Sequence, residues 1–327
     1  MIILRSIFSY KIAKTFWYKF RKIFSSKTTE ILSPTAPKSF IWGNLRECNL
    51  PNTPKIIWTF WDGPESKCAE ICQKSWEKNK SDFLIIRLNS SSIKKYISNF
   101  PKTPENIPIQ LTTDLLRLML LEKYGGIWLD YSAFLTTPLD WIIDLTKRND
   151  TEALVFYNQF HDEYLNSTER PVIENGLIAA RPQSRFIRIW RKKLEQCLFS
   201  DDYKTYFEKK NNYQELIKNF ITKDKRTLSY LSCYISAQWV MLKSKNFRLT
   251  LINAEDEFYY TYYKTKPPRN RWRFAEELLL KQNTKKNQLP KILKITGGHR
   301  TVVDEYIKYN CFRENSLFGQ FLYDRNK

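Results

Sequence analysis

The sequence predicts an α/β fold in which a mostly parallel β-sheet is flanked by helices. Short apolar runs that are typical of buried strands alternate along the chain with stretches of helical periodicity. Hydrophobic residues make up 42% of the 327 residues, which is enough for a large core and excludes global disorder. The apolar run GGIWLD ends in Asp130, and ligands of such sheets bind beyond the carboxyl ends of the strands.

The first part of this pattern predicts two strands, each followed by a helix. The run PKIIWTF at 54–60 is a strand that the turn WDGP ends, and a helix is expected over 65–79. FLIIRL at 83–88 is a second strand, and a short helix at 90–99 follows it before Pro101.

The segment LTTDLLRLMLLEKYGG predicts a helix that begins at Thr112 and Thr113, the candidate caps, and ends at Gly125. We expect this helix to be buried, because it is apolar on nearly every side. The strand IWLD follows it directly. The later pattern predicts further strands at 153–158, 171–182 and 291–296. It also predicts a mainly helical region from 183 to about 245.

The N-terminal segment is basic and amphipathic. Residues 1–27 carry seven Lys or Arg and no acid, and their apolar residues recur near helical spacing. This predicts a helix that lies on an anionic membrane; the alternative is a helix packed on the protein's own body. No uncharged run approaches the roughly 20 residues that cross a bilayer, and no signal-peptide pattern occurs. The expected organisation is a basic segment at 1–40 followed by one domain at 41–327. This domain is expected to have a helical insertion at about 183–245 and a basic C-terminal region at about 264–327.

The net charge of +20 indicates an anionic partner: nucleic acid, an acidic membrane or a phosphorylated substrate. Genome composition is a simpler explanation for part of it. Residues 264–300 hold eleven Lys or Arg and two Glu, next to the aromatic run 258–263, and could contact nucleic acid, a sugar diphosphate or only solvent. Neither GxGxxG nor GxxxxGK[ST] occurs, which disfavours a dinucleotide-binding fold and a P-loop enzyme. Six scattered cysteines without a CxxC pair predict reduced, buried thiols.

Three charged residues fall within seventeen positions around the glycine pair. Asp114 and Arg117 are three apart and therefore share one face of the apolar helix. The strand carries Asp130 to the same edge of the sheet. A structural ion pair is one explanation for Asp114 and Arg117; a ligand site at the sheet edge is the other. Carboxylates of this kind suit a divalent cation that bridges a diphosphate.

These residues resemble those of a known family. The segments PKIIWTFWDG, TTDLLRLMLLEKYGGIWLDYSAFLTTPL and VIENGLIAARP are similar to the capsular polysaccharide synthesis glycosyltransferases, a DXD sugar-transferase group related to glycosyltransferase family 32. The resemblance covers about residues 50–245. It implies a GT-A-like, Rossmann-like fold and a retaining transferase that uses a nucleotide sugar.

The resemblance also implies roles for single residues. Asp130 is the first aspartate of the DXD motif and contacts the ribose or the metal-bound diphosphate. Asp114 and Arg117 hold and orient the donor sugar, so these three are the expected catalytic residues. Trp61 matches the tryptophan that packs on the nucleotide base, and Asn175 lies on a segment that faces the sugar.

The chain departs from the DXD motif at Ser132, where the second aspartate is expected. A hydroxyl is a weaker metal ligand than a carboxylate, so the need for Mn²⁺ or Mg²⁺ becomes uncertain. With Asp130 and Ser132, His299 in TGGHR is the candidate third ligand, and Arg300 is a candidate contact for phosphate. A structural role is the alternative for His299 and for His161. No nucleophile stands out, and the carboxylates to test are Glu174 and Asp162.

The function expected from the sequence is the transfer of a hexose from a nucleotide sugar, such as a UDP-sugar, to a surface glycan. The acceptor is lipid-linked or a growing capsular glycan. The protein is then expected to be cytoplasmic and peripheral at the inner face of the plasma membrane, with an anionic membrane surface as partner and no nucleic acid. The alternatives are a basic nucleic-acid-binding protein and a catalytically degenerate scaffold.

Overall fold

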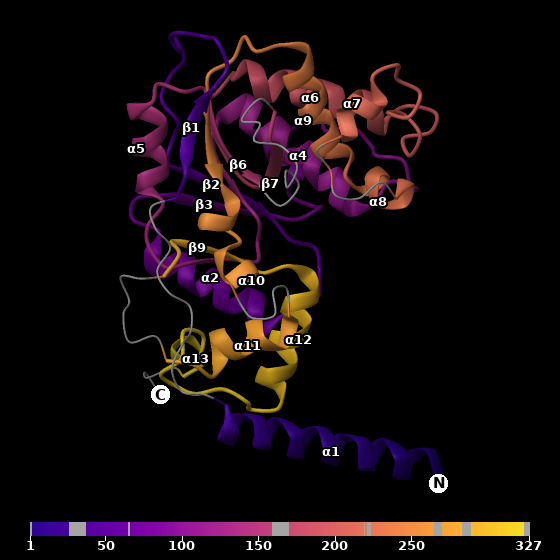
Figure 1. Cartoon of the computed structure of the whole chain (residues 1–327), viewed down its shortest axis with the longest axis vertical. Helices are drawn as coiled ribbons and strands as arrows, with labels where there is room; N and C mark the ends of the chain where they lie inside the picture. The colour runs from indigo at the N-terminus through magenta and orange to yellow at the C-terminus, as the bar shows by residue number, and fades with distance from the viewer. Residues whose placement is uncertain are drawn as a thin grey trace.

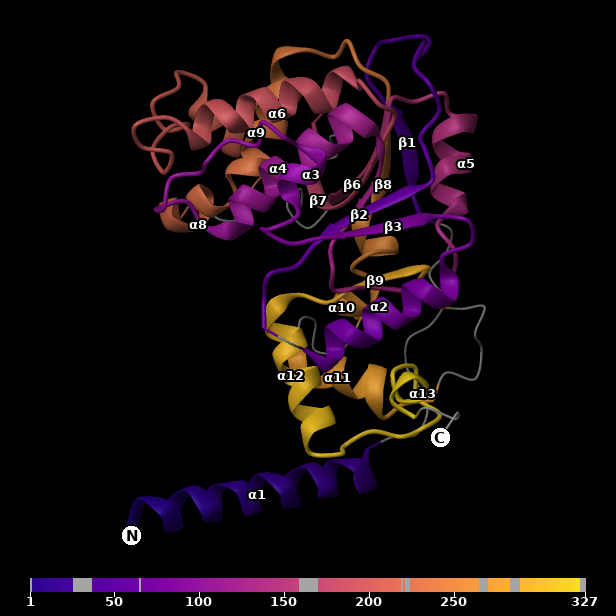
Figure 2. The same ribbon diagram turned by 180° about the vertical axis from the view of Figure 1, so that it is seen from behind.

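The chain folds around one mixed sheet that has helices on both faces (Figures 1 and 2). The computed structural model describes residues 2–25, 37–64, 66–158, 170–218, 220, 224–264, 270–282 and 289–323. Seven strands form the sheet in the order β1-β8-β6-β7-β4-β2-β3. Their bounds are β1 Ser39–Trp42, β2 Ile56–Phe60, β3 Leu84–Leu88, β4 Gly126–Leu129, β6 Ala153–Asn158, β7 Val172–Ala180 and β8 Leu249–Asn253.

Five of the seven strands run in one direction. β2 is parallel to β3 and to β4, and β6 is parallel to β8. β7 is antiparallel to both of its neighbours, β4 and β6, and β1 is antiparallel to β8 at the edge. The prediction of an α/β fold with a mostly parallel sheet flanked by helices is therefore confirmed, with β7 reversed at its centre.

Alternate residues of β4 face two different cores, as the period of two in a strand requires. Trp128 belongs to the core beneath α4, α6 and α9, whereas Ile127 and Leu129 belong to the core on the opposite face, near α2 and α5. The strand is buried throughout because helices cover both faces. The helices are α2 Lys67–Asn79, α3 Ile93–Tyr96, α4 Ile109–Tyr124, α5 Asp140–Arg148, α6 Arg185–Leu198, α7 Tyr213–Ile217, α8 Lys225–Tyr230 and α9 Ser232–Lys243.

A third core lies below the sheet, where α2 packs against the C-terminal helices (Figure 1). A two-stranded ribbon of β5 and β9 joins this layer to the sheet. α1 lies along the base of the layer in both views, and its Tyr18 side chain is buried in the core. The elements are α1 Ile2–Phe24, β5 Ala133–Leu135, α10 Tyr260–Lys264, α11 Arg271–Leu279, β9 Ile292–Lys294, α12 Gly297–Lys308 and α13 Gly319–Leu322, with a short 3₁₀ turn at Ala254–Asp256.

Most of the predicted elements are confirmed, including the basic N-terminal helix and the helical region after residue 183. The start of α4 was predicted wrongly: the helix begins at Ile109 after Pro108, and Thr113 lies inside it, where its Oγ1 donates to the Ile109 carbonyl at 2.8 Å. The pattern missed β1, β5 and β8. All six cysteines are free and buried, as expected.

Candidate active site

The turn into β4 places Asp130 at the end of a central strand. Gly125 and Gly126 have φ angles of +66° and +96°, which favour glycine, and a Cβ on Gly126 would come within 2.7 Å of the Ile56 carbonyl oxygen. The chain therefore passes directly from α4 into the sheet. Beyond the strand, the Asp130 amide donates to the carbonyl of Gly176 on β7 at 2.9 Å, which fixes the aspartate between the two strands.

α4 supplies a buried ion pair to the same place. Arg117 Nη2 lies 2.7 Å from Asp114 Oδ1, and both residues are buried. The Arg117 guanidinium also donates through Nη1 to the backbone carbonyl of Asn175 and lies 3.5 Å from Asp130 Oδ1. Asn175 completes the network, because its Nδ2 donates to Asp114 Oδ1 at 3.1 Å. The four residues predicted around the donor sugar, Asp114, Arg117, Asp130 and Asn175, thus form one connected cluster.

Asp130 accepts hydrogen bonds at both carboxylate oxygens. Trp128 Nε1 donates to Oδ1 at 3.0 Å, and the Lys294 ammonium donates to Oδ2. Lys294 ends β9, in the ribbon below the sheet, and its side chain is mostly buried. The side chain of Asp130 keeps 25% of its surface exposed, so it faces an opening that Arg117 and Lys294 border.

The two aspartates differ in their acidity. Burial raises the pKa of Asp114 to about 6, although the neighbouring Arg117 charge acts in the opposite direction. Burial also acts on Asp130, but Lys294 and Arg117 outweigh it and hold the pKa of this carboxyl below its usual range. Burial would lower the pKa of Arg117, yet Asp114 and Asp130 raise it above its usual value. Asp130 is therefore the more acidic of the two aspartates.

Glu174 lies beside this cluster on β7. Its carboxylate accepts from the Gly176 amide at 3.2 Å and from the Tyr234 hydroxyl at 3.3 Å. Burial raises the pKa of Glu174. The charge of Lys294 lowers this pKa, whereas the charge of Asp130 raises it further. Among the two carboxylates proposed for a direct role, Glu174 is next to the site, whereas Asp162 lies outside the described residues, as does His161.

Aromatic rings cover a second part of the site. Trp61 follows β2 and stacks on Tyr131, with ring centroids 5.1 Å apart and planes 17° apart. The Arg300 guanidinium carbon lies 4.7 Å from the Trp61 ring centroid. Since Tyr131 directly follows Asp130, this aromatic surface is continuous with the carboxylate cluster. A half-buried aromatic stack of this kind can pack against a nucleotide base.

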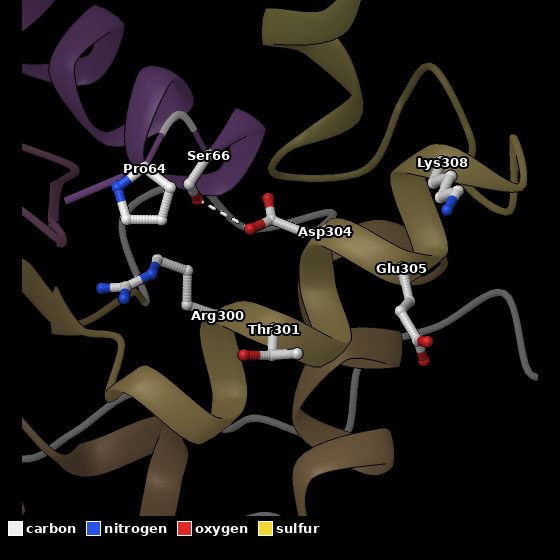
Figure 3. A pocket seen from close by; sticks show the side chains of 7 residues that line it. All are labelled: Pro64, Ser66, Arg300, Thr301, Asp304, Glu305 and Lys308. Carbon is white, nitrogen blue, oxygen red and sulfur yellow. Dashed lines mark hydrogen bonds between the residues drawn. The ribbon is translucent and has the colours of Figure 1, made fainter.

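A pocket of about 270 Å³ lies next to Arg300, between the start of α2 and α12. Figure 3 shows Arg300 extended toward Pro64 and the Ser66 hydroxyl bonded to Asp304. Asp304 also accepts from the Cys68 amide at 2.8 Å, so this carboxylate caps α2. The lining is Pro64, Ser66, Arg300, Thr301, Asp304, Glu305 and Lys308.

The residues predicted to bind a divalent cation do not fit such a site. The Ser132 hydroxyl is buried and donates to the Ile295 carbonyl at 2.8 Å. His299 Nδ1 pairs with the Thr296 hydroxyl at 2.7 Å, and its ring packs against Tyr262 and Phe274. The described residues contain no group of three or more His, Cys, Asp or Glu side chains that could hold a metal ion. The expectation of Mn²⁺ or Mg²⁺ on Asp130, Ser132 and His299 therefore lacks a suitable set of donor atoms.

Sequence reasoning missed Lys294 and Tyr131. Lys294 is one of eleven basic residues in its region, and nothing in the pattern KILKIT distinguishes it. It reaches Asp130 because β9 pairs with β5, three residues beyond that aspartate. Tyr131 had a signal that could have been used, since it is an aromatic residue directly after the motif aspartate.

The fold and the site together define an α/β protein with a mostly parallel sheet and a carboxylate–guanidinium cluster at the strand ends. The sequence model of the capsular polysaccharide synthesis protein family matches residues 9–270, which is most of the chain. The chain therefore belongs to the capsular polysaccharide synthesis protein family, and the predicted resemblance is confirmed.

Individual relatives are more distant. The chain is 28% identical over 153 residues to the O-glycosyltransferase braB of Annulohypoxylon truncatum. This match covers 42% of this chain and 36% of that protein. The chain thus spans about a third of the length of this curated relative. Two solved structures are similar in fold: a glycosyltransferase involved in glycosylation of the major capsid of PBCV-1, and the glycosyltransferase GlyE of Streptococcus pneumoniae TIGR4. They are 10% and 13% identical, both with a TM-score of 0.40, and the matches cover 79% and 83% of this chain and 99% and 63% of theirs.

Proposed function

We propose that this protein is a retaining glycosyltransferase that takes a hexose from a nucleotide sugar, such as a UDP-sugar, for capsular polysaccharide synthesis. The observation that carries the proposal is the cluster of Asp114, Arg117 and Asp130 at the strand ends, next to the half-buried stack of Trp61 on Tyr131. The cluster offers charged acceptors and donors for a sugar and a ribose, and the stack offers a surface for the base. Membership of the family supports the same activity.

The roles follow from the chemistry of a sugar–diphosphate bond. Cleavage leaves negative charge on the diphosphate, so the leaving group requires cations that are already in place. Lys294 and Arg300 border the proposed donor site and supply that charge. Asp114 and Arg117 orient the donor sugar, and Asn175 holds this pair in position. Front-face attack, in which the leaving phosphate takes the acceptor proton, would retain the configuration without a protein nucleophile.

A thermal-shift panel of UDP, GDP, CMP and dTDP tests the donor site. A ligand present well above its dissociation constant stabilises the native state by a few kcal/mol, so one nucleotide should raise the Tm by several degrees. That nucleotide also names the donor class. If no nucleotide shifts the Tm at millimolar concentration, the proposal of a nucleotide-sugar donor is wrong. The result would then favour a nucleic-acid-binding protein or a catalytically degenerate scaffold.

We also propose that α1 holds the protein at an anionic membrane surface, where a lipid-linked glycan is the acceptor. This corresponds to a peripheral protein at the inner face of the plasma membrane. No helix in the part of the chain that the structure describes is long and apolar enough to cross a membrane. The proposal therefore rests on how α1 is oriented.

One face of α1 is docked on the C-terminal layer by polar and aromatic contacts. Lys14 Nζ lies 2.8 Å from Glu305, whose carboxylate also accepts from the Tyr18 hydroxyl at 2.9 Å. Tyr18 stacks on Tyr309, with ring centroids 4.7 Å apart. Arg21 Nη1 lies 3.2 Å from Glu276. The alternative predicted for this helix, packing on the protein's own body, is thus confirmed for this face.

The opposite face of α1 is apolar and exposed. Ile12, Phe16, Phe20 and Ile23 recur at intervals of four, four and three residues, so they form one stripe, and 50% to 71% of each residue's surface is exposed. Lys19 is exposed next to this stripe. A rigidly docked helix that presents Phe and Ile outward on a protein of net charge +20 has the form of an interfacial membrane helix.

α12 connects this helix to the proposed donor site. Its first turns carry Arg300, which lies over Trp61, and its later turns carry Glu305 and Tyr309, which contact α1. At 1.5 Å per residue, about 14 Å along the helix axis separates Arg300 from Tyr309. With α1 on the membrane, this short separation would place the proposed donor site close to the membrane surface that holds the acceptor.

The double substitution Phe16→Ser and Phe20→Ser should weaken binding to vesicles of equal phosphatidylglycerol and phosphatidylcholine by at least about tenfold, because each inserted Phe contributes on the order of 1 kcal/mol or more. Co-sedimentation measures the effect. The matched control is Leu84→Ser with Ile109→Ser, two exposed apolar residues away from α1, which should leave binding unchanged. Equal binding of both variants and the wild type would contradict the membrane role.

A further inference from the structure

The Lys294 ammonium pairs with the Asp130 carboxylate at the proposed donor site. Its ammonium donates to Asp130 Oδ2, the carboxylate oxygen away from Trp128 and Arg117. Gly176 borders the same oxygen: a Cβ there would come within 3.2 Å of Asp130 Oδ2. A Cβ there would also come within 2.9 Å of the Phe258 ring, so the glycine lets this ring pack beside the ion pair.

An ammonium group can bridge two anions. Lys has three N–H donors and no acceptor, and one of them is directed at Asp130. The others are able to donate to phosphate oxygens, in charge-assisted hydrogen bonds that are stronger than neutral ones. The burial of the Lys294 side chain strengthens this attraction, because solvent screens it less.

The charges around Asp130 disfavour a divalent cation as the bridge. Asp114 and Asp130 are balanced by Arg117 and Lys294, all within one cluster of contacts. A divalent ion would have to displace the ammonium from Asp130, and Ser132, whose hydroxyl donates to Ile295, would give it no second carboxylate. Among the residues that the structure describes, the carboxylate of Glu174 also lies beside the cluster, and it accepts from Tyr234 and from the Gly176 amide.

We propose that Lys294 binds the donor diphosphate directly, as the bridge between Asp130 and the phosphates, so that donor binding requires no divalent cation. This rests on the proposed function, because it assumes a nucleoside diphosphate at Asp130. Lys294 is then a residue of the donor site that recognises the leaving group.

Titration calorimetry with UDP and GDP, and with uridine and guanosine as phosphate-free counterparts, tests the proposal. For the diphosphate that binds, we expect affinities in EDTA and in Mn²⁺ to agree within about threefold. Lys294→Met should lose at least about tenfold in affinity for the diphosphate, while the affinity for its nucleoside stays the same. A lysine that served only to hold the fold would change both affinities alike. Lys294→Arg, which keeps the charge, should retain most of the diphosphate affinity.

Lys291→Met is the matched control, because Lys291 begins the same segment but lies over the Trp141 ring, 4.5 Å from its centroid. It should bind the diphosphate as the wild type does. Diphosphate binding that appears only with Mn²⁺ would overturn the role of Lys294 and leave the proposed function standing, and this comparison needs only the wild type. Equal loss of diphosphate and nucleoside binding in Lys294→Met would also overturn it. If neither diphosphate binds in either condition, the role of Lys294 is overturned, whereas the proposed function fails only if no nucleotide of the thermal-shift panel binds.

Discussion

Asp130→Asn should lower the affinity for the donor nucleotide by at least about 30-fold. The substitution keeps the shape of the side chain but removes the charge that faces Arg117 and Lys294. Loss of one partner from a hydrogen-bonded charge cluster costs about 2 to 5 kcal/mol in binding, which corresponds to this factor or more. Calorimetric titration with the nucleotide that the thermal-shift panel selects measures the change.

The control for Asp130 is Asp82→Asn. Asp82 precedes β3, at the edge of the sheet where parallel strands begin, and its exposed carboxylate pairs with Lys55 at 2.6 Å. This variant should bind the nucleotide with unchanged affinity, since it alters one surface charge on the far side of the sheet. Wild-type affinity in Asp130→Asn would remove Asp130 from the donor site, whatever the control does.

Arg117→Met should destabilise the fold by about 3 to 5 kcal/mol, because it leaves the buried Asp114 carboxylate without its cation. Only 5% of the surface of Arg117 and 7% of that of Asp114 is exposed, so water cannot replace the lost contact. The carbonyl of Asn175 loses its donor as well. The free energy of unfolding in urea measures the effect.

Two further variants test whether the loss of stability comes from the Asp114–Arg117 pair and not from removing any arginine. Arg191→Met, on α6, removes a more exposed guanidinium that pairs with Glu122 at 2.7 Å, and should cost no more than about 1 kcal/mol. The double variant Arg117→Met with Asp114→Asn should recover part of the loss, because the buried charge is gone. A cost below about 1 kcal/mol for Arg117→Met would show that the cluster does not support the fold.

Much of the fold was predictable because its signals are local. Gly125 ends α4 and Gly126 begins β4, in backbone conformations that favour glycine, so the two residues mark the junction in the sequence itself. The apolar run of α4 predicted its burial in the same way. Among the strands that were missed, β5 has only three residues, and its pattern is too brief to have a period.

The candidate site was predictable to the extent that its residues are close in sequence. Asp114, Arg117 and Asp130 were placed together because one helix and one strand carry them to the same edge. The hydrogen-bond partner of Ser132 could not be predicted from the sequence. Its hydroxyl donates to the carbonyl of Ile295, which lies 163 residues later in the chain. A motif shows which side chain is present, whereas its partner depends on which distant segment folds against it.

The sequence by itself determined that an aspartate ends a buried strand beside a buried Asp–Arg pair, and that the N-terminal helix is basic and amphipathic. The tertiary structure decided what those groups face. Lys294 reaches Asp130 across 164 residues, and α1 turns Tyr18 and Arg21 inward and Phe16 and Phe20 outward. The physical reason is that hydrophobic periodicity arises between near neighbours, whereas the pairing of buried charges depends on packing between elements that only the complete fold brings together.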